Sequence, residues 1–149
     1  MLRLESVDPG NWRLGQKVSE SQKRFVSDDM RLLARAYAYR DSRSNAYVIY
    51  DDYVPVGMAL YYDCDEQKAF DFSQIFIDER YQGKGFGTEA AQQILKIMES
   101  DGKYDKVILC YIDGNEAAKN MYEKLGFYPT VESDGDEIIM EKIMKRREK

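Results

Sequence analysis

Runs of apolar residues, some alternating with polar residues and some continuous, predict a series of short β-strands along the chain. The runs cover residues 2–7, 46–50, 54–62, 69–78, 107–112, 127–131 and 136–143. Near the end of the run at 69–78, Ile75, Phe76 and Ile77 follow one another without alternation. Such a stretch is typical of a strand that is covered on both faces, or of one that a bulge interrupts.

Apolar residues at helical spacing predict the remaining elements. This spacing occurs at 11–25, after the N-capping sequence Ser27-Asp28-Asp29, at 88–99 and at 115–125. The order of strands and helices along the chain predicts an α/β fold of the mixed α+β kind. We expect a largely antiparallel sheet of about seven strands, about four helices and one βαβ step. A chain of 149 residues has the usual length of one domain, so residues 1–149 are predicted to form a single domain.

Charge and composition narrow the classes of function. The chain carries 27 acidic and 22 basic residues, for a net charge of −5, whereas proteins that bind nucleic acids usually have an excess of basic residues. The acidic balance therefore argues against nucleic acid and favours a cationic partner. No apolar run approaches a membrane span, and the N-terminus lacks the residue order of a signal peptide. We therefore expect a cytoplasmic protein that does not bind membranes.

Two residue types limit the available chemistry. The chain has no histidine, which excludes Ser-His and Cys-His catalytic pairs and histidine metal sites. The two cysteines, Cys64 and Cys110, are too few and too far apart in the sequence for a zinc site or a disulfide framework. They are predicted to be free thiols in a reducing compartment, and no metal is expected.

A glycine-rich segment, Gln82-Gly83-Lys84-Gly85-Phe86-Gly87-Thr88, lies between a predicted strand and a predicted helix. Glycines allow a tight turn and bring backbone N–H groups close to an anion, and the helix N-terminus favours negative charge. Lys84 adds a positive charge. The segment matches neither of the two commonest nucleotide-binding patterns, G-x-G-x-x-G and G-x-x-x-x-G-K-[ST]. It predicts a pyrophosphate-binding loop, and a glycine-rich turn that binds nothing is the alternative.

The chain resembles the GNAT family of acetyl-coenzyme-A-dependent N-acetyltransferases. Gln82, Gly85 and Gly87 match the family signature Q/R-x-x-G-x-G/A. A second match, closer to the C-terminus, consists of Asn115, Ala118, Tyr122 and Leu125-Gly126-Phe127. The resemblance covers nearly the whole chain and implies the GNAT acyltransferase fold with acetyl-CoA as co-substrate. Within the family, residues 76–85 look most like the bacterial spermine/spermidine acetyltransferases.

The resemblance also implies which residues hold the co-substrate. The backbone of Ile75, Phe76 and Ile77 would pair with the pantetheine arm like an added strand, and an N–H from this stretch would polarise the thioester carbonyl. The pyrophosphate would be held by Gln82, Gly83, Lys84, Gly85, Phe86, Gly87 and Thr88. Asn115 would contact the pantetheine together with Ala118, although Asn115 also suits a helix N-cap, and the two roles can coexist.

Acid and base roles follow from the same resemblance. Tyr122 would protonate the departing thiolate, and a tyrosine of the core is the alternative reading. Polyamine-acetylating relatives carry a carboxylate at about the position of Ser73, so this departure leaves the base open. Asp71, two residues earlier on the same side of an ideal strand, is one candidate base, and a water chain that ends at a carboxylate is another. Glu20, Asp71 and Ser73 are the candidate acceptor-binding residues.

Together these features predict a GNAT N-acetyltransferase that transfers acetyl from acetyl-CoA to a primary amine by direct attack in a ternary complex. A polyamine such as spermine or spermidine is the first choice of acceptor. The alternatives are a protein N-terminus, a lysine or another small amine, or a coenzyme-A-binding sensor without catalytic activity. The resemblance also allows a homodimer.

Overall fold

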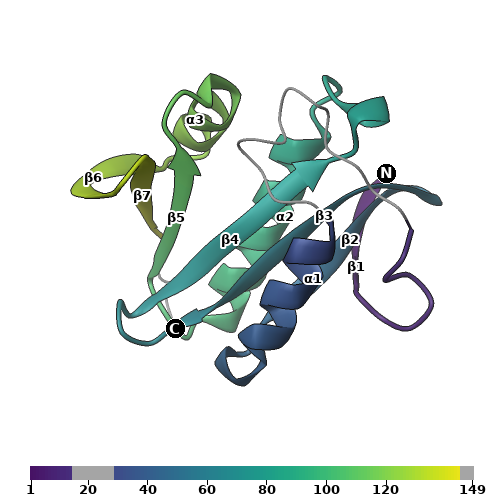
Figure 1. Cartoon of the computed structure of the whole chain (residues 1–149), viewed down its shortest axis with the longest axis horizontal. Coiled ribbons are helices and arrows are strands. Elements are labelled where there is room, and N and C mark those ends of the chain that lie inside the picture. The colour runs from purple at the N-terminus through teal and green to yellow at the C-terminus, as the bar shows by residue number, and fades with distance from the viewer. Residues whose placement is uncertain (15–28, 145–149) are drawn as a thin grey trace.

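The computed structural model describes residues 1–14 and 29–144 of the chain, without the side chains of 132–134. Seven strands form one sheet in the order β1-β2-β3-β4-β5-β7-β6 (Figure 1). The strands are β1 (Leu2–Ser6), β2 (Asn45–Asp51), β3 (Val54–Cys64), β4 (Ala69–Ile77), β5 (Lys106–Ile112), β6 (Tyr128–Asp134) and β7 (Glu137–Ile143). Neighbouring strands are antiparallel except β4 and β5. The predicted sheet of mostly antiparallel strands with one βαβ step is confirmed.

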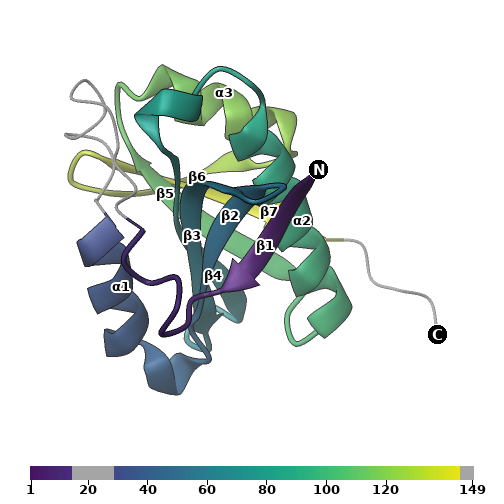
Figure 2. The ribbon, with the colours of Figure 1, turned by 90° about the vertical axis from the view of Figure 1, so that its right-hand side faces the viewer.

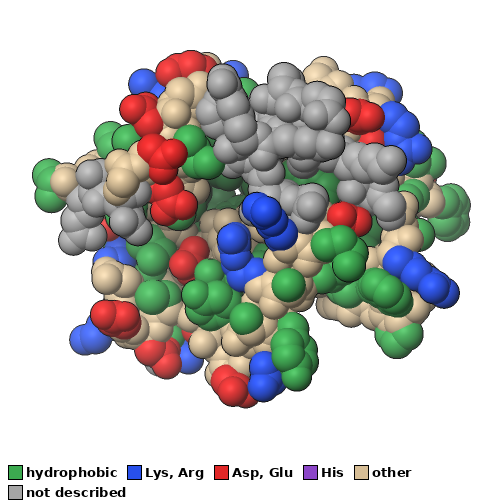
Figure 3. Space-filling model, in the orientation of Figure 1, with side chains coloured by type: hydrophobic (Ala, Val, Ile, Leu, Met, Phe, Trp, Pro, Cys, Tyr) green, Lys and Arg blue, Asp and Glu red, His purple; other side chains and the backbone are tan. Residues whose placement is uncertain are grey.

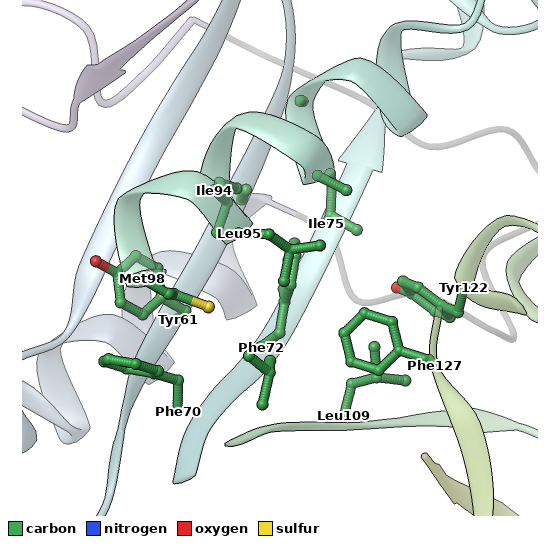
Figure 4. Packing of buried hydrophobic residues seen from close by; sticks show 14 of the residues in the cluster. Tyr61, Phe70, Phe72, Ile75, Ile94, Leu95, Met98, Leu109, Tyr122 and Phe127 are labelled. Carbon is green, nitrogen blue, oxygen red and sulfur yellow. The ribbon is translucent and has the colours of Figure 1, made fainter. Parts of the chain in front are cut away.

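Two helices cover opposite faces of the sheet (Figure 2). On one face, α1 (Asp29–Ala38) buries Leu32 against a cluster that includes Val48, Leu60 and Phe76. On the other face, α2 (Phe86–Asp101) packs its apolar side against the larger core, which includes Phe70, Phe72 and Ile75 (Figure 4). The residues that α2 contributes are Ala90, Ala91, Ile94, Leu95 and Met98.

The remaining helix, α3 (Glu116–Lys124), follows β5, and short 3-10 turns occur at Arg40–Ser42 and Glu79–Tyr81. Among the described residues there are three α-helices rather than the expected four or so. The expected helix at 11–25 does not begin at Asn11, because Asp8 and Asn11 form a local turn. The Asp8 carboxylate accepts the N–H groups of Gly10 and Asn11 at 2.8 and 2.9 Å, and Asn11 Oδ1 accepts the Asp8 N–H at 2.8 Å. Residues 15–25 of that expectation lie outside the described part of the chain.

The two parallel strands separate soon after they begin. Strands β4 and β5 pair only at Phe70–Val107 and Asp71–Ile108, whereas β4 stays paired with β3 as far as Gly57–Ile77. Figure 1 shows β4 and β5 diverging, with α3 above the end of β5. The separation leaves an opening at the carboxyl ends of two parallel strands, where α/β proteins commonly bind ligands.

Cover on both faces accounts for the absence of alternation at residues 75–77, and a bulge in β4 comes just before them. The register of β4 against β3 shifts between Leu60 and Tyr62, after which Ile75 packs in the α2-side core and Phe76 in the α1-side cluster. The end of β4 is therefore covered on both faces as well as bulged. Among the described residues, no helix is both long enough and apolar enough to cross a membrane.

Candidate active site

A cavity of about 570 Å³ lies where β4 and β5 separate. Its walls come from α1, β4, the glycine loop, the start of α2, β5, α3 and the start of β7. The predicted site residues that line it are Ser73, Ile75, Phe76, Ile77, Gln82, Gly83, Gly85, Phe86, Gly87, Thr88, Asn115, Ala118 and Tyr122. Lys84 and Asp71 are not among the lining residues, and Glu20 lies outside the described part of the chain.

The β4 wall of the cavity presents backbone groups. Because pairing with β5 ends at Asp71, backbone groups on that edge of β4 have no strand partner between Ser73 and Ile77 within the described part of the chain. Groups on a strand edge can bind an extended ligand as an added strand. The Ile77 carbonyl is already occupied, because it accepts a hydrogen bond of 3.0 Å from Gln82 Nε2.

A tightly bonded turn carries the chain from β4 to the glycine loop. The Asp78 side chain is 1% exposed. Its carboxylate accepts hydrogen bonds from the Arg80 backbone N–H at 3.0 Å and from the Arg80 guanidinium at 2.9 and 3.1 Å. The Asp78 N–H also donates to the Val56 carbonyl of β3 at 2.7 Å. These bonds fix the turn on the sheet, so the loop begins at a defined position beside the cavity.

The glycine loop has the conformation that the sequence predicts. Gly83 and Gly85 have φ values of +80° and +81°, and a Cβ atom at either position would meet no atom within 4 Å. The backbone conformation, rather than crowding, therefore requires glycine here. Gly85 is the N-cap of α2 without a side-chain cap, so the first N–H groups of α2 have no partner within the helix. These groups lie at the cavity and suit a phosphate.

The wall opposite β4 is formed partly by α3, which holds two of the predicted residues. Asn115 is the N-cap of α3, and its Oδ1 accepts the Ala118 N–H at 3.3 Å. This bond leaves the side-chain amide of Asn115 able to donate into the cavity. Tyr122 is buried and packs edge to face on Phe127, with 5.8 Å between ring centroids (Figure 4). Burial, and to a smaller extent the nearby Cys110, raises the pKa of Tyr122, so its hydroxyl keeps its proton at neutral pH.

Charged side chains lie in and beside the gap between β4 and β5. Arg35 of α1 and Glu137 of β7 line the cavity, and Asp71 lies beside it. Burial raises the pKa of Asp71 to about 6; the nearby Arg35 opposes this rise, and Glu137 adds to it. A carboxylate with this pKa is mostly ionised at pH 7 and can still take up a proton.

Comparison with known proteins identifies the family. Residues 11–127 match the model of the acetyltransferase (GNAT) family. The chain belongs to the GNAT family of acetyltransferases. Enzymes of this family use acetyl-CoA, so the cavity between β4 and β5 is a candidate site for this co-substrate. Its unpaired strand edge and its helix N-terminus fit a pantetheine arm and a pyrophosphate, respectively.

Individual relatives share less than a third of their residues with this chain. The GNAT chain is 29% identical over 96 residues to a spermine/spermidine N(1)-acetyltransferase of Bacillus subtilis, and the match spans 59% of this chain and 63% of that protein. Its fold is similar to spermidine N-acetyltransferase from Vibrio cholerae, solved in complex with CoA and spermine, with a TM-score of 0.76, 18% identity and 96% and 95% of the two chains covered. An aminoglycoside acetyltransferase solved with coenzyme A gives a TM-score of 0.77 at 15% identity, with 96% and 95% covered.

Several residues that line the GNAT cavity carry no signal in the sequence. They are Arg35, Gln74, Cys110, Tyr111 and Glu137. Arg35 and Glu137 are more than 100 residues apart, and only the pairing of β7 with β5 brings Glu137 to the cavity. Cys110 is partly exposed, but desolvation at its sulfur together with the nearby Glu137 and Asp71 raises the pKa of the thiol to about 12. This thiol is neutral and is a poor nucleophile.

Proposed function

We propose that this GNAT acetyltransferase transfers the acetyl group of acetyl-CoA to a primary amine of a polyamine such as spermine or spermidine. The observation that carries the choice of acceptor is a pair of carboxylates, with Glu137 in the lining of the cavity and Asp71 beside it. Carboxylates attract and orient ammonium groups. The net charge of −5 and the match to a spermine/spermidine N(1)-acetyltransferase support the same acceptor. Acidic side chains also gather on the α3 side of the face shown in Figure 3.

In this proposal the coenzyme extends along the β4 wall. The pantetheine arm pairs with the backbone of Ile75, Phe76 and Ile77 and receives a hydrogen bond from the Asn115 amide. The pyrophosphate binds the loop from Gln82 to Thr88 and the free N–H groups at the start of α2. This placement brings the thioester close to the bulge of β4, between Tyr122 and the charged end of the cavity.

Acetyl transfer then proceeds in one displacement. The neutral amine attacks the thioester carbonyl, and a backbone N–H in residues 75–77 stabilises the negative charge that develops on the carbonyl oxygen. The C–S bond breaks as the C–N bond forms, and Tyr122 donates a hydrogen bond or its proton to the departing sulfur. An acyl-enzyme is not required, since the amine attacks the thioester directly.

The amine must lose a proton before or during the attack, because an alkyl ammonium has a pKa of about 10.4. We propose Asp71 as the final acceptor of this proton, either directly or through water. Ser73 lines the cavity on the same strand and, by the family resemblance, lies at about the position where polyamine-acetylating relatives carry a carboxylate. Asp71 would supply that carboxylate from two residues earlier in β4.

A second acceptor class is a protein amine, either an N-terminus or a lysine. Arg35 favours it, because a guanidinium that lines the cavity can bind a carboxylate next to the reacting amine. The third alternative, a coenzyme A sensor without catalysis, has no need for a proton donor at the position of Tyr122.

An acceptor panel tests the proposal. Thiol release from acetyl-CoA would be measured with spermine, spermidine, a lysine peptide with a blocked N-terminus, a lysine-free peptide with a free N-terminus, and no acceptor. We expect saturable release with the polyamines and a product heavier by one acetyl group. Glu137→Gln should raise the KM for spermidine several-fold, whereas Glu141→Gln on the same strand should not. Thiol release with a peptide but not with the polyamines would favour a protein amine as acceptor. Tight coenzyme A binding without thiol release for any amine would favour the sensor.

A further inference from the structure

Arg35 joins helix α1 to the irregular part of β4. Its Nη1 atom donates hydrogen bonds to Ser73 Oγ at 3.2 Å and to Gln74 Oε1 at 3.4 Å. Between the pairs Leu60–Gln74 and Tyr62–Asp71, three steps along β4 correspond to two steps along β3. Phe72 and Ser73 therefore form the bulge, and Gln74 is the first paired residue after it. One guanidinium from α1 contacts both Ser73 and Gln74.

This contact matters because Ser73 and Gln74 immediately precede Ile75 to Ile77, the segment proposed to bind the thioester. A bulged strand lacks part of its ladder of hydrogen bonds, and β5 no longer supports β4 on its other edge at this point. The hydrogen bonds from Arg35 supply an attachment from a third element. Arg35 is thus placed to hold the backbone next to the reacting group in a fixed position.

Arg35 also provides positive charge to the groups around Asp71. Those groups are Tyr62 of β3, Ser73 of β4, Cys110 of β5 and Glu137 of β7. The charge of Arg35 lowers the pKa values of Asp71, Tyr62 and Cys110, against the effect of burial. Glu137 has the opposite effect on Asp71. The balance between Arg35 and Glu137 therefore affects the protonation of the proposed base.

We propose that Arg35 is a positioning residue for acetyl transfer, which holds residues 73 and 74 at the β4 bulge beside the thioester and places a positive charge near Asp71, the proposed acceptor of the amine proton. This inference rests on the proposed function of Asp71. Arg35 itself does not exchange a proton with the substrate, since a guanidinium stays charged in proteins.

The test compares Arg35→Gln and Arg35→Lys with the wild type. The first readout is the titration of the Asp71 side-chain carboxyl carbon by NMR in the free protein, assigned from the signal missing in Asp71→Asn. The second is the pH profile of kcat/KM with acetyl-CoA and spermidine. Arg31→Gln is the control, because Arg31 is exposed on the same helix, one turn earlier, and the substitution removes the same charge.

We expect Asp71 to titrate near pH 6 in the wild type and in Arg31→Gln, and about one pH unit or more higher in Arg35→Gln, since a positive neighbour favours the carboxylate. The acid limb of kcat/KM should move upward by the same amount. In Arg35→Lys, the acid limb of the kcat/KM profile should stay at the wild-type pH. The kcat of this variant should still fall, because Nη1 donates both hydrogen bonds and the lysine side chain, one bond shorter, does not carry its ammonium to the same point.

An unchanged Asp71 titration in Arg35→Gln would overturn the inference. A fall in coenzyme A affinity as large as the fall in kcat/KM would also overturn it, because Arg35 would then act on folding or coenzyme binding. The proposed function fails in a different way. If Asp71→Asn retained the acid limb, Asp71 would not be the base, whatever the NMR titration of the Arg35 variants showed.

Discussion

Gly57 and Phe76 lie so close together that a Cβ atom on Gly57 would be 2.3 Å from the Phe76 carbonyl oxygen. Gly57 belongs to β3 and pairs with Ile77 at the end of β4. The contact involves backbone, which cannot rotate away as a flexible side chain can. Strand β3 therefore supports the part of β4 that forms the proposed pantetheine wall, and the space for a side chain at residue 57 is absent.

Gly57→Ala should consequently destabilise the fold. Making room for the methyl group requires β4 to shift, and overpacking of this kind costs roughly 1–3 kcal/mol. Urea unfolding measures this loss. Gly87→Ala is the matched control, because a Cβ atom at Gly87 would lie 3.5 Å from Met121 Sδ and 3.6 Å from Ile77 Cγ1, which are ordinary contacts. Equal unfolding midpoints for the two variants would show that β3 and β4 are not as closely apposed as described.

Gly85→Asp should abolish coenzyme A binding. The substitution places a carboxylate at the N-cap of α2, where the account puts the pyrophosphate. Gly102→Asp controls for both strain and charge, because Gly102 has a φ of +74° and lies at the opposite end of the same helix. Isothermal titration calorimetry should give wild-type affinity for Gly102→Asp and no detectable binding for Gly85→Asp. Unaltered affinity in Gly85→Asp would place the phosphate site elsewhere.

Tyr122→Phe should lower kcat by roughly 100-fold or more, the range typical of a lost general acid, and leave coenzyme A affinity nearly unchanged. The reason is that the ring packing on Phe127 is retained while the hydroxyl is removed. Thiol release and calorimetry on the same preparation measure the two quantities. Tyr53→Phe, at a position 89% exposed, should behave as the wild type. A parallel loss of kcat and of coenzyme A affinity would assign Tyr122 to binding rather than to proton donation.

Asp71→Asn should stabilise the protein above pH 6. The pKa of Asp71 is raised to about 6 from an ordinary 3.8, so the folded state favours the protonated form. Its contribution to stability is fully present below about pH 4 and is lost as the pH rises through 6. At pH 8 the Asn variant should therefore be more stable than the wild type by roughly 1–3 kcal/mol, and at pH 4 the two should be nearly equal. Urea unfolding at both pH values measures the difference.

Asp41→Asn is the control for this pH effect. Asp41 is exposed, and its substitution changes the net charge by the same amount. Asp41→Asn should show the same pH dependence of the free energy of unfolding as the wild type. If Asp71→Asn also left that dependence intact, the buried carboxyl would not titrate near pH 6, and its proposed role as base would lose its main support.

Motifs with a local physical basis are predictable from the sequence. The tight turn through Gly83 and Gly85 and the N-cap at Asn115 depend on residues a few positions apart, and the sequence predicts both. The alternation of apolar residues likewise predicts the strands. The helix expected at 11–25 shows the limit of such patterns, because residues 11–13 form a turn rather than a helix.

Features that depend on distant pairings are not predictable in this way. The separation of β4 from β5 after Asp71–Ile108 creates the cavity, yet each strand has an ordinary pattern. Arg35 and Glu137 reach the cavity from α1 and β7, and neither belongs to a motif. Their roles become visible only when helix packing and strand order are known.

A crystal structure of the protein with bound coenzyme A tests the central claim most directly. The account predicts a pantetheine arm that bonds to the backbone of β4 between Ile75 and Ile77. It also predicts the pyrophosphate at the start of α2, within hydrogen-bonding distance of the N–H groups of residues 85–88, and the thiol beside Tyr122. Coenzyme A bound away from the gap between β4 and β5, or strands that close on each other in its presence, would contradict it.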